Sequence, residues 1–123
     1  MSEYRQEAMF SYFDEKIAAC ERKKDTLLQD DRADEATFEK IRANVYDIFK
    51  AMLRAGVKAS GAQEEAVKRF FLEKTEQIPA SWLESCRKAE QYGDIEKMQI
   101  ETIKLETVKE IRAAFERIWG VRK

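Results

Sequence analysis

The chain has 123 residues, of which 44% are hydrophobic and 38% are charged, and its net charge is −1. This length fits a single domain, residues 1–123, that can bury a core without help from disulfides or metal ions. Basic and acidic residues are spread evenly along the chain, whereas nucleic-acid-binding proteins usually carry a basic surface. No apolar run is long enough to span a membrane. These features argue against both nucleic acid and membrane as partners.

The chain contains no histidine, and this absence excludes many kinds of active site. Ser-His and Cys-His nucleophilic pairs, histidine general bases and histidine-containing metal sites are all ruled out. The four glycines do not cluster into a phosphate-binding loop. We therefore expect a protein that is not an enzyme and has no catalytic, cofactor-binding or metal-ligating residues.

The two cysteines, Cys20 and Cys86, form no Cys-x-x-Cys pair, and each lies on the apolar stripe of an expected helix. Such a position favours a small buried hydrophobic residue over a redox thiol. The N-terminus lacks the basic start and the apolar run of a signal peptide. Together these features predict a cytoplasmic protein with free thiols.

In the first half of the chain, apolar residues recur at the three- and four-residue steps that are typical of helices. We expect a first helix over residues 3–28, capped by Ser2 with Glu3 in its first turn, and a second over 35–58. Gly56 or Gly61 is expected to end the second helix in a left-handed conformation.

The segment between these helices, QDDRADEATFEK over residues 29–40, is rich in acidic residues. Its spacing does not place oxygen ligands where a calcium-binding loop needs them. Asp34 stands instead where a helix N-cap is expected. Asp30 and Asp31 are left at the C-terminal end of the first helix, where carboxylates are unfavourable. If any surface of this protein binds a cation or a basic partner, this segment is the first candidate.

A third helix is expected to start near Ser60, which forms a capping box with Gln63. Pro79 lacks a backbone donor and disfavours helical geometry at the residue before it, so we expect a break there. Ser81 and Glu84 form another capping box, which predicts that a short helix restarts at residue 82.

A last helix is expected from about residue 95 to 119, with Gly93 ending the preceding helix and Asp94 capping this one. Apolar residues cover much of the circumference of its first half, so we expect that half to touch neighbours on two sides. The predicted fold is all-α: an up-and-down antiparallel helical bundle with three long helices plus one short helix after the break at Pro79.

Two tyrosine-containing stretches, RANVYD (42–47) and YRQEAMFSYF (4–13), are candidates for lining a pocket. Aromatic rings with a few convergent polar groups are typical of ligand sites. Helical bundles also place such residues at the edge of the core, where a hydroxyl reaches water. The residues that we single out for a pocket or interface are Arg42, Asn44, Tyr46, Trp82 and Trp119.

Several charged residues fall at informative positions of the helical pattern. Lys24 and Lys74 lie in register with apolar stripes, where long stems can cover apolar surface while the ammonium group reaches water. The sequence leaves open whether either lysine is buried. Glu101, Glu106 and Glu110 alternate with lysines on the last helix, which is typical of a solvated face with paired charges.

The segment DDRADEATFEKIRANVYDIFKAML, residues 30–53, resembles the middle of short uncharacterised helical proteins from Firmicutes. The resemblance covers about a fifth of the chain and rests mostly on cap and core residues. It implies a bacterial all-helical protein, and it brings no catalytic or binding residues and no function with it.

Two kinds of function remain open. The first is a non-enzymatic interaction or assembly module, with a homodimer as one form, because 13 aromatic residues and wide apolar stripes favour an exposed apolar patch. The alternative is a small-molecule binding protein with an inter-helix pocket lined by aromatic residues. The expected partner is therefore a protein, and a small molecule is not excluded.

Overall fold

The computed structural model of the protein describes residues 2–120, with side chains from residue 4 onward. The predicted capping by Ser2 and Glu3 therefore lies outside the described side chains. Within this range the chain forms helices and no strands, which confirms the all-α prediction. The four helices are α1 (Ser2–Gln29), α2 (Ala33–Ala59), α3 (Glu64–Gln91) and α4 (Ile95–Trp119). None of these helices is both long and apolar enough to cross a bilayer.

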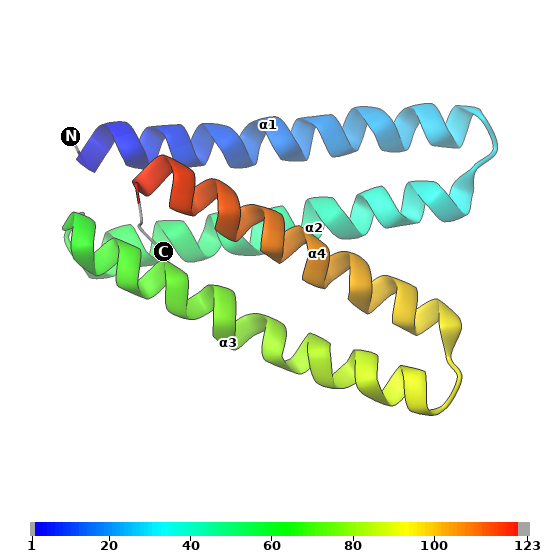
Figure 1. Cartoon of the computed structure of the whole chain (residues 1–123). Helices are drawn as coiled ribbons and strands as arrows, with labels where there is room; N and C mark the ends of the chain where they lie inside the picture. The colour runs from blue at the N-terminus through cyan, green and yellow to red at the C-terminus, as the bar shows by residue number, and fades with distance from the viewer. Residues whose placement is uncertain (1, 121–123) are drawn as a thin grey trace.

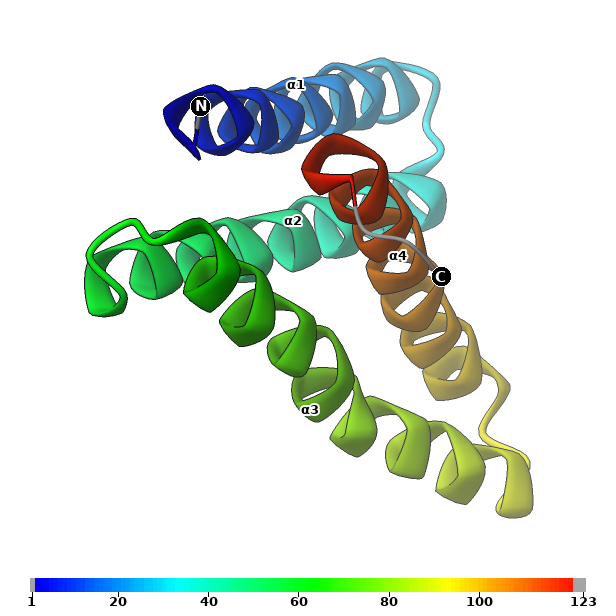
Figure 2. The same ribbon diagram turned by 60° about the vertical axis from the view of Figure 1, so that its left-hand side comes forward.

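The helices form two hairpins, α1–α2 and α3–α4, and successive helices run in opposite directions (Figure 1). The hairpins meet at the end of the molecule that holds the α2–α3 connection, and they diverge toward the α1–α2 and α3–α4 connections (Figure 2). We call these the closed end and the open end. The arrangement is thus up and down, but it is not a regular bundle along its whole length.

An aromatic core fills the closed end, and all four helices contribute to it. The ring of Phe71 on α3 lies 6.3 Å from that of Phe13 on α1, 6.1 Å from Phe49 on α2 and 4.4 Å from Phe115 on α4, centroid to centroid. Ring pairs at these distances add to the free energy gained from burial alone. Other fully or almost fully buried residues of this core are Met9, Leu53, Val67, Ile111 and Trp119.

Pro79 does not break α3, so the predicted break and the separate short helix after it are wrong. The proline is buried, and helix continues for another three turns beyond it. Side-chain hydrogen bonds support the turn before it: Thr75 Oγ1 donates to the carbonyl of Leu72 at 2.6 Å and accepts from Arg112 of α4 at 3.2 Å. Packing of α3 against the neighbouring helices therefore outweighs the loss of the one backbone hydrogen bond that Pro79 cannot donate. Figure 2 shows α3 bending in its middle.

The three helix connections share one geometry, in which the second residue after the helix has a positive φ. These residues are Asp31, Gly61 and Gly93, with φ of 59°, 59° and 71°. In each connection the next N–H returns to a carbonyl five residues earlier, at 2.9, 3.0 and 2.8 Å respectively, which is the Schellman motif. Gly61, and not Gly56, is therefore the left-handed residue that follows the second helix. Aspartate takes the glycine position only at the open end.

Of the predicted N-caps whose side chains are described, one is confirmed and three are wrong. Asp94 is confirmed, because its side chain accepts a hydrogen bond from the N–H of Lys97 at 3.1 Å. Asp34 is not the cap of α2, which starts one residue earlier, at Ala33. Ser60 ends α2 instead of starting α3, and its hydroxyl donates back to a carbonyl of α2. Ser81 lies inside a continuous helix and caps nothing.

Candidate functional site

A mainly apolar groove lies at the open end, between α2 and the first half of α4. It encloses about 340 Å³. One side chain comes from α2 and the others from two turns of α4. The lining residues are Phe38, Ile95, Met98, Gln99, Thr102 and Ile103. We call this hollow the apolar groove.

The groove lies where the two hairpins diverge, beside the first two turns of α4. The sequence predicted contacts on two sides for the first half of this helix. In the first two turns Ile95 is 68% exposed, and Met98 and Ile100 are only half-buried, whereas Ile103 further along is buried. On its other side, α4 does contact α3, where the thiol of Cys86 lies 3.8 Å from the hydroxyl of Thr102.

The groove continues toward the hairpin tips into a hollow of about 380 Å³ with an acidic edge. Asp34 of α2 and Glu96 of α4 line this part from opposite sides. Among the described residues, neither carboxylate forms an ion pair. Both lie in the first turn of their helices, where a negative charge interacts favourably with the helix dipole. The other lining residues are Thr37, Phe38, Ile95, Gln99 and Ile100.

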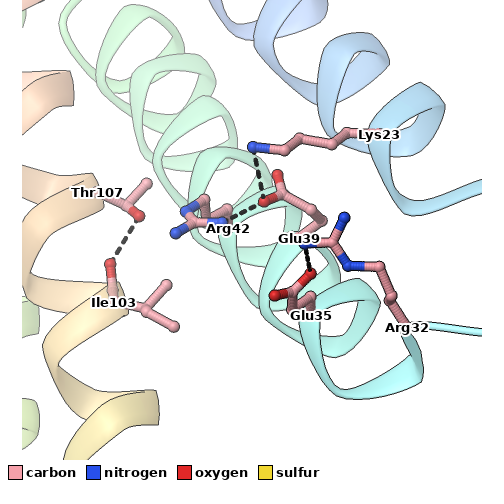
Figure 3. Close-up of polar contacts among 7 residues, drawn as sticks. All are labelled: Lys23, Arg32, Glu35, Glu39, Arg42, Ile103 and Thr107. Atoms are coloured by element: carbon pink, nitrogen blue, oxygen red, sulfur yellow. Dashed lines mark hydrogen bonds and ion pairs between the residues drawn. The ribbon is translucent and has the colours of Figure 1, made fainter. Parts of the chain in front are cut away.

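A charged hollow of about 310 Å³ lies beside the groove, between α1 and α2, and Phe38 borders both. Figure 3 shows the carboxylate of Glu39 held between Lys23 of α1, at 3.6 Å, and Arg42 of α2. Arg32 pairs with Glu35 one turn away. Every charge in this hollow therefore has a partner of opposite sign.

Glu39 is the most enclosed member of this charged hollow, since its side chain is only 7% exposed. A carboxylate that leaves water needs compensating partners, and its two cations provide them. Burial, with the nearby charge of Glu39 as a second cause, raises the pKa of the Cys20 thiol. A thiol with a raised pKa is a poor nucleophile at neutral pH. The cluster thus joins α1 to α2 and does not activate Cys20.

The two predicted tyrosine stretches meet between α1, α2 and α4. The rings of Tyr12 and Tyr46 pack edge to face with centroids 6.2 Å apart. Tyr46 donates to Glu110 Oε1 at 3.0 Å, and Lys16 pairs with the same oxygen at 3.1 Å. Burial raises the pKa of Tyr12 to about 12 and also raises that of Tyr46, with Glu110 adding to both effects. Both phenols are therefore weak acids, and among the described residues only the Tyr46 hydroxyl has a hydrogen-bond partner, whereas the Tyr12 hydroxyl is buried without one.

The five residues singled out from sequence do not form one pocket. Arg42 and Tyr46 lie one turn apart on the same side of α2, whereas Asn44 between them is exposed. Trp82 packs against Phe49, and the ammonium nitrogen of Lys104 lies over the Trp82 ring, 5.5 Å from its centroid. Trp119 is stacked in the core of the closed end, and its indole N–H donates to a backbone carbonyl of α3.

The charged positions also differ from expectation in part. Lys24 and Lys74 are half-buried, and each bonds to a side chain of its own helix, Glu21 and Gln77 respectively. Glu101 is not on a solvated face: it is 5% exposed, and Lys104 satisfies one of its oxygens. Cys20 is buried as expected, but Cys86 is half-exposed.

Sequence reasoning missed the groove, Lys23 and the burial of Glu39. Phe38 lies three residues before Ile41, at a helical apolar spacing, and this spacing does not distinguish a residue that meets a neighbour from one where two hairpins diverge. The enclosure of Glu39 had a signal, since it lies one residue from Phe38 and three from Arg42 on a helix.

Among the described residues, no group of three or more Cys, Asp and Glu side chains is arranged to hold a metal ion. The described residues that line the apolar groove are mostly apolar and include no ionisable side chain. Comparisons of the chain with protein-family models, with curated proteins and with solved structures found no match. The likeness to helical Firmicutes proteins therefore stays a prediction.

Proposed function

We propose that this protein is a non-enzymatic interaction module that binds an amphipathic helix of a partner protein in the apolar groove. The observation that carries the proposal is the apolar lining of the groove, from Phe38 on α2 to Ile95 and Met98 on α4, at the point where the hairpins separate. Docking of an amphipathic helix into an apolar groove is a common mode of protein recognition.

A bound helix would occupy the place that the divergence leaves open. At the closed end, α2 and α4 surround an aromatic core. At the open end, a helix between them would cover Phe38 and Ile95 and remove their exposed surface from water. Complete burial of a side chain of this size contributes roughly 1.5–3 kcal/mol relative to exposure.

A partner protein suits the groove better than a second copy of this chain. A two-fold dimer places the same surface of each copy against the other. Pairing through the groove would therefore bring Asp34 and Glu96 of one copy against the same carboxylates of the other. The alternative of an aromatic small-molecule pocket has less support, since Tyr46, Trp82 and Trp119 each pack on another ring.

The test uses a fluorescent peptide of about 20 residues with leucines at the i, i+3, i+4, i+7 spacing and glutamine or alanine elsewhere. Anisotropy should report binding to the wild-type protein and about tenfold weaker binding to the I95Q/M98Q variant. The matched control is L28Q/L83Q, which removes two exposed apolar residues that do not line the groove. Equal loss in both variants, or none in either, would contradict the proposal.

Light scattering after gel filtration separates the two kinds of occupant. We expect the wild-type protein to be a monomer at high micromolar concentration. A dimer that becomes monomeric only in I95Q/M98Q would assign the groove to self-assembly and count against a partner helix. Circular dichroism of each variant establishes that the helices remain intact.

A further inference from the structure

The acidic edge of the groove has no basic counterpart. Asp34 and Glu96 face the same hollow, and no lysine or arginine lines either this hollow or the apolar groove. A helix lying in the groove would run its flanks along these carboxylates. Their position favours an occupant that carries positive charge.

Helix stability alone accounts for Asp34 and Glu96, because first-turn carboxylates offset the helix dipole. It does not account for the two aspartates that precede them. Asp30 and Asp31 follow the C-terminal end of α1, where negative charge is unfavourable. Asp31 also has a φ of 59°, a conformation that glycine holds in the other two connections.

Acidic residues extend from this connection to the hollow that adjoins the groove. Asp31, Asp34 and Glu35 line one hollow at the tip of the first hairpin, and Asp34 also lines the acidic hollow that adjoins the apolar groove. The only cation there, Arg32, pairs with Glu35. The edge therefore keeps a net negative charge where α2 begins.

We propose that the partner helix is basic: it carries lysine or arginine on both flanks of its apolar face, opposite Asp34 and Glu96. This inference rests on the proposed function, since it describes the chemistry of the groove's occupant. Long basic side chains suit this geometry. Their stems can lie along Thr37 and Ile100 while the charged ends reach the carboxylates at the edge.

The experiment compares three peptides that share the leucine positions given above and differ only in the flanking residues, which are lysine, glutamine or glutamate. Affinities are measured by anisotropy at low and at high salt. We expect the lysine peptide to bind most tightly and the glutamate peptide most weakly. The differences should shrink as salt screens the exposed charges.

A pair of variants locates the effect. D34N/E96Q should weaken binding of the lysine peptide about fivefold and leave the glutamine peptide unchanged, as expected for two exposed charge pairs. The matched control, E15Q/E73Q, removes two exposed carboxylates of α1 and α3 that do not line the groove. It should bind all three peptides as the wild-type protein does.

The outcomes separate this inference from the proposed function. Equal binding of all three peptides, lost in I95Q/M98Q, would overturn the basic partner and leave the helix-binding groove intact. Equal weakening by D34N/E96Q and E15Q/E73Q would overturn it too, because the attraction would then come from overall charge. If no peptide binds, both proposals fail.

Discussion

The two ends of this molecule use the same kind of helix for different purposes. At the closed end, rings from all four helices meet around Phe71, and the core is complete. At the open end, the same helices leave Ile95 68% exposed and enclose a groove beside Phe38. The comparison shows that apolar spacing along a helix predicts which side chains form its apolar face. How the helices cross determines whether another helix of the same chain covers that face.

The largest expected difference between the ends is in stability. Phe71→Ala should lower the free energy of unfolding by about 3–5 kcal/mol, because it leaves a cavity among the three rings that pack on Phe71. Phe38→Ala should cost about 1 kcal/mol or less, since this ring is only half-buried. Urea unfolding followed by circular dichroism measures both. Similar losses for the two variants would mean that the open end is as well packed as the closed end.

The next prediction concerns Pro79, which lies in the middle of α3. A proline inside a helix costs about 3 kcal/mol relative to alanine, whereas loss of two buried ring carbons costs about 0.8 kcal/mol each. Pro79→Ala should therefore raise the free energy of unfolding by about 1 kcal/mol. Urea unfolding gives the sign. A decrease would show that the ring is needed for packing of α3 between its neighbours.

The same proline shows why sequence alone misjudged one helix. Its local effect on Ile78 and on the backbone favours a break, and Ser81 with Glu84 fits a helix start. Both signals are local, and packing of α3 against α2 and α4 overrides them. Local signals succeeded where nothing opposed them, as at Asp94, which caps α4, and at Gly93, which follows α3 with a positive φ.

The candidate site was harder to predict than the fold, because it depends on how two hairpins cross. Tyr46 and Arg42 lie on one side of α2 as their spacing required, but Trp82 and Trp119 lie elsewhere. The apolar pattern of α2 does not distinguish Phe38, which lines the groove, from Phe49, which lies in the core. Only the acidic segment around Asp31 was singled out in advance, and it borders the groove.

The smallest expected effect compares one position at the two ends. Asp31 at the open end and Gly61 at the closed end have the same φ of 59° at the second position after their helices, and Gly61 is followed by Ala62, which has a φ of 63°. Asp31→Gly should raise the free energy of unfolding by about 0.5–1 kcal/mol, because glycine accepts this conformation without a steric cost. Gly61→Asp should lower it by a similar amount, and there is space for the side chain. Urea unfolding of both variants measures the pair.

The two substitutions should differ in binding, and this difference tests why aspartate is present. Asp31→Gly removes one charge near the groove and should weaken the lysine peptide slightly while the fold becomes more stable. Gly61→Asp adds a charge at the far end of the molecule and should leave peptide binding unchanged. If Asp31→Gly stabilised the protein without weakening the lysine peptide, the aspartate would be unrelated to the groove. An Asp31→Gly variant that is more stable but binds the lysine peptide more weakly would instead show that Asp31 contributes to binding at a cost in stability.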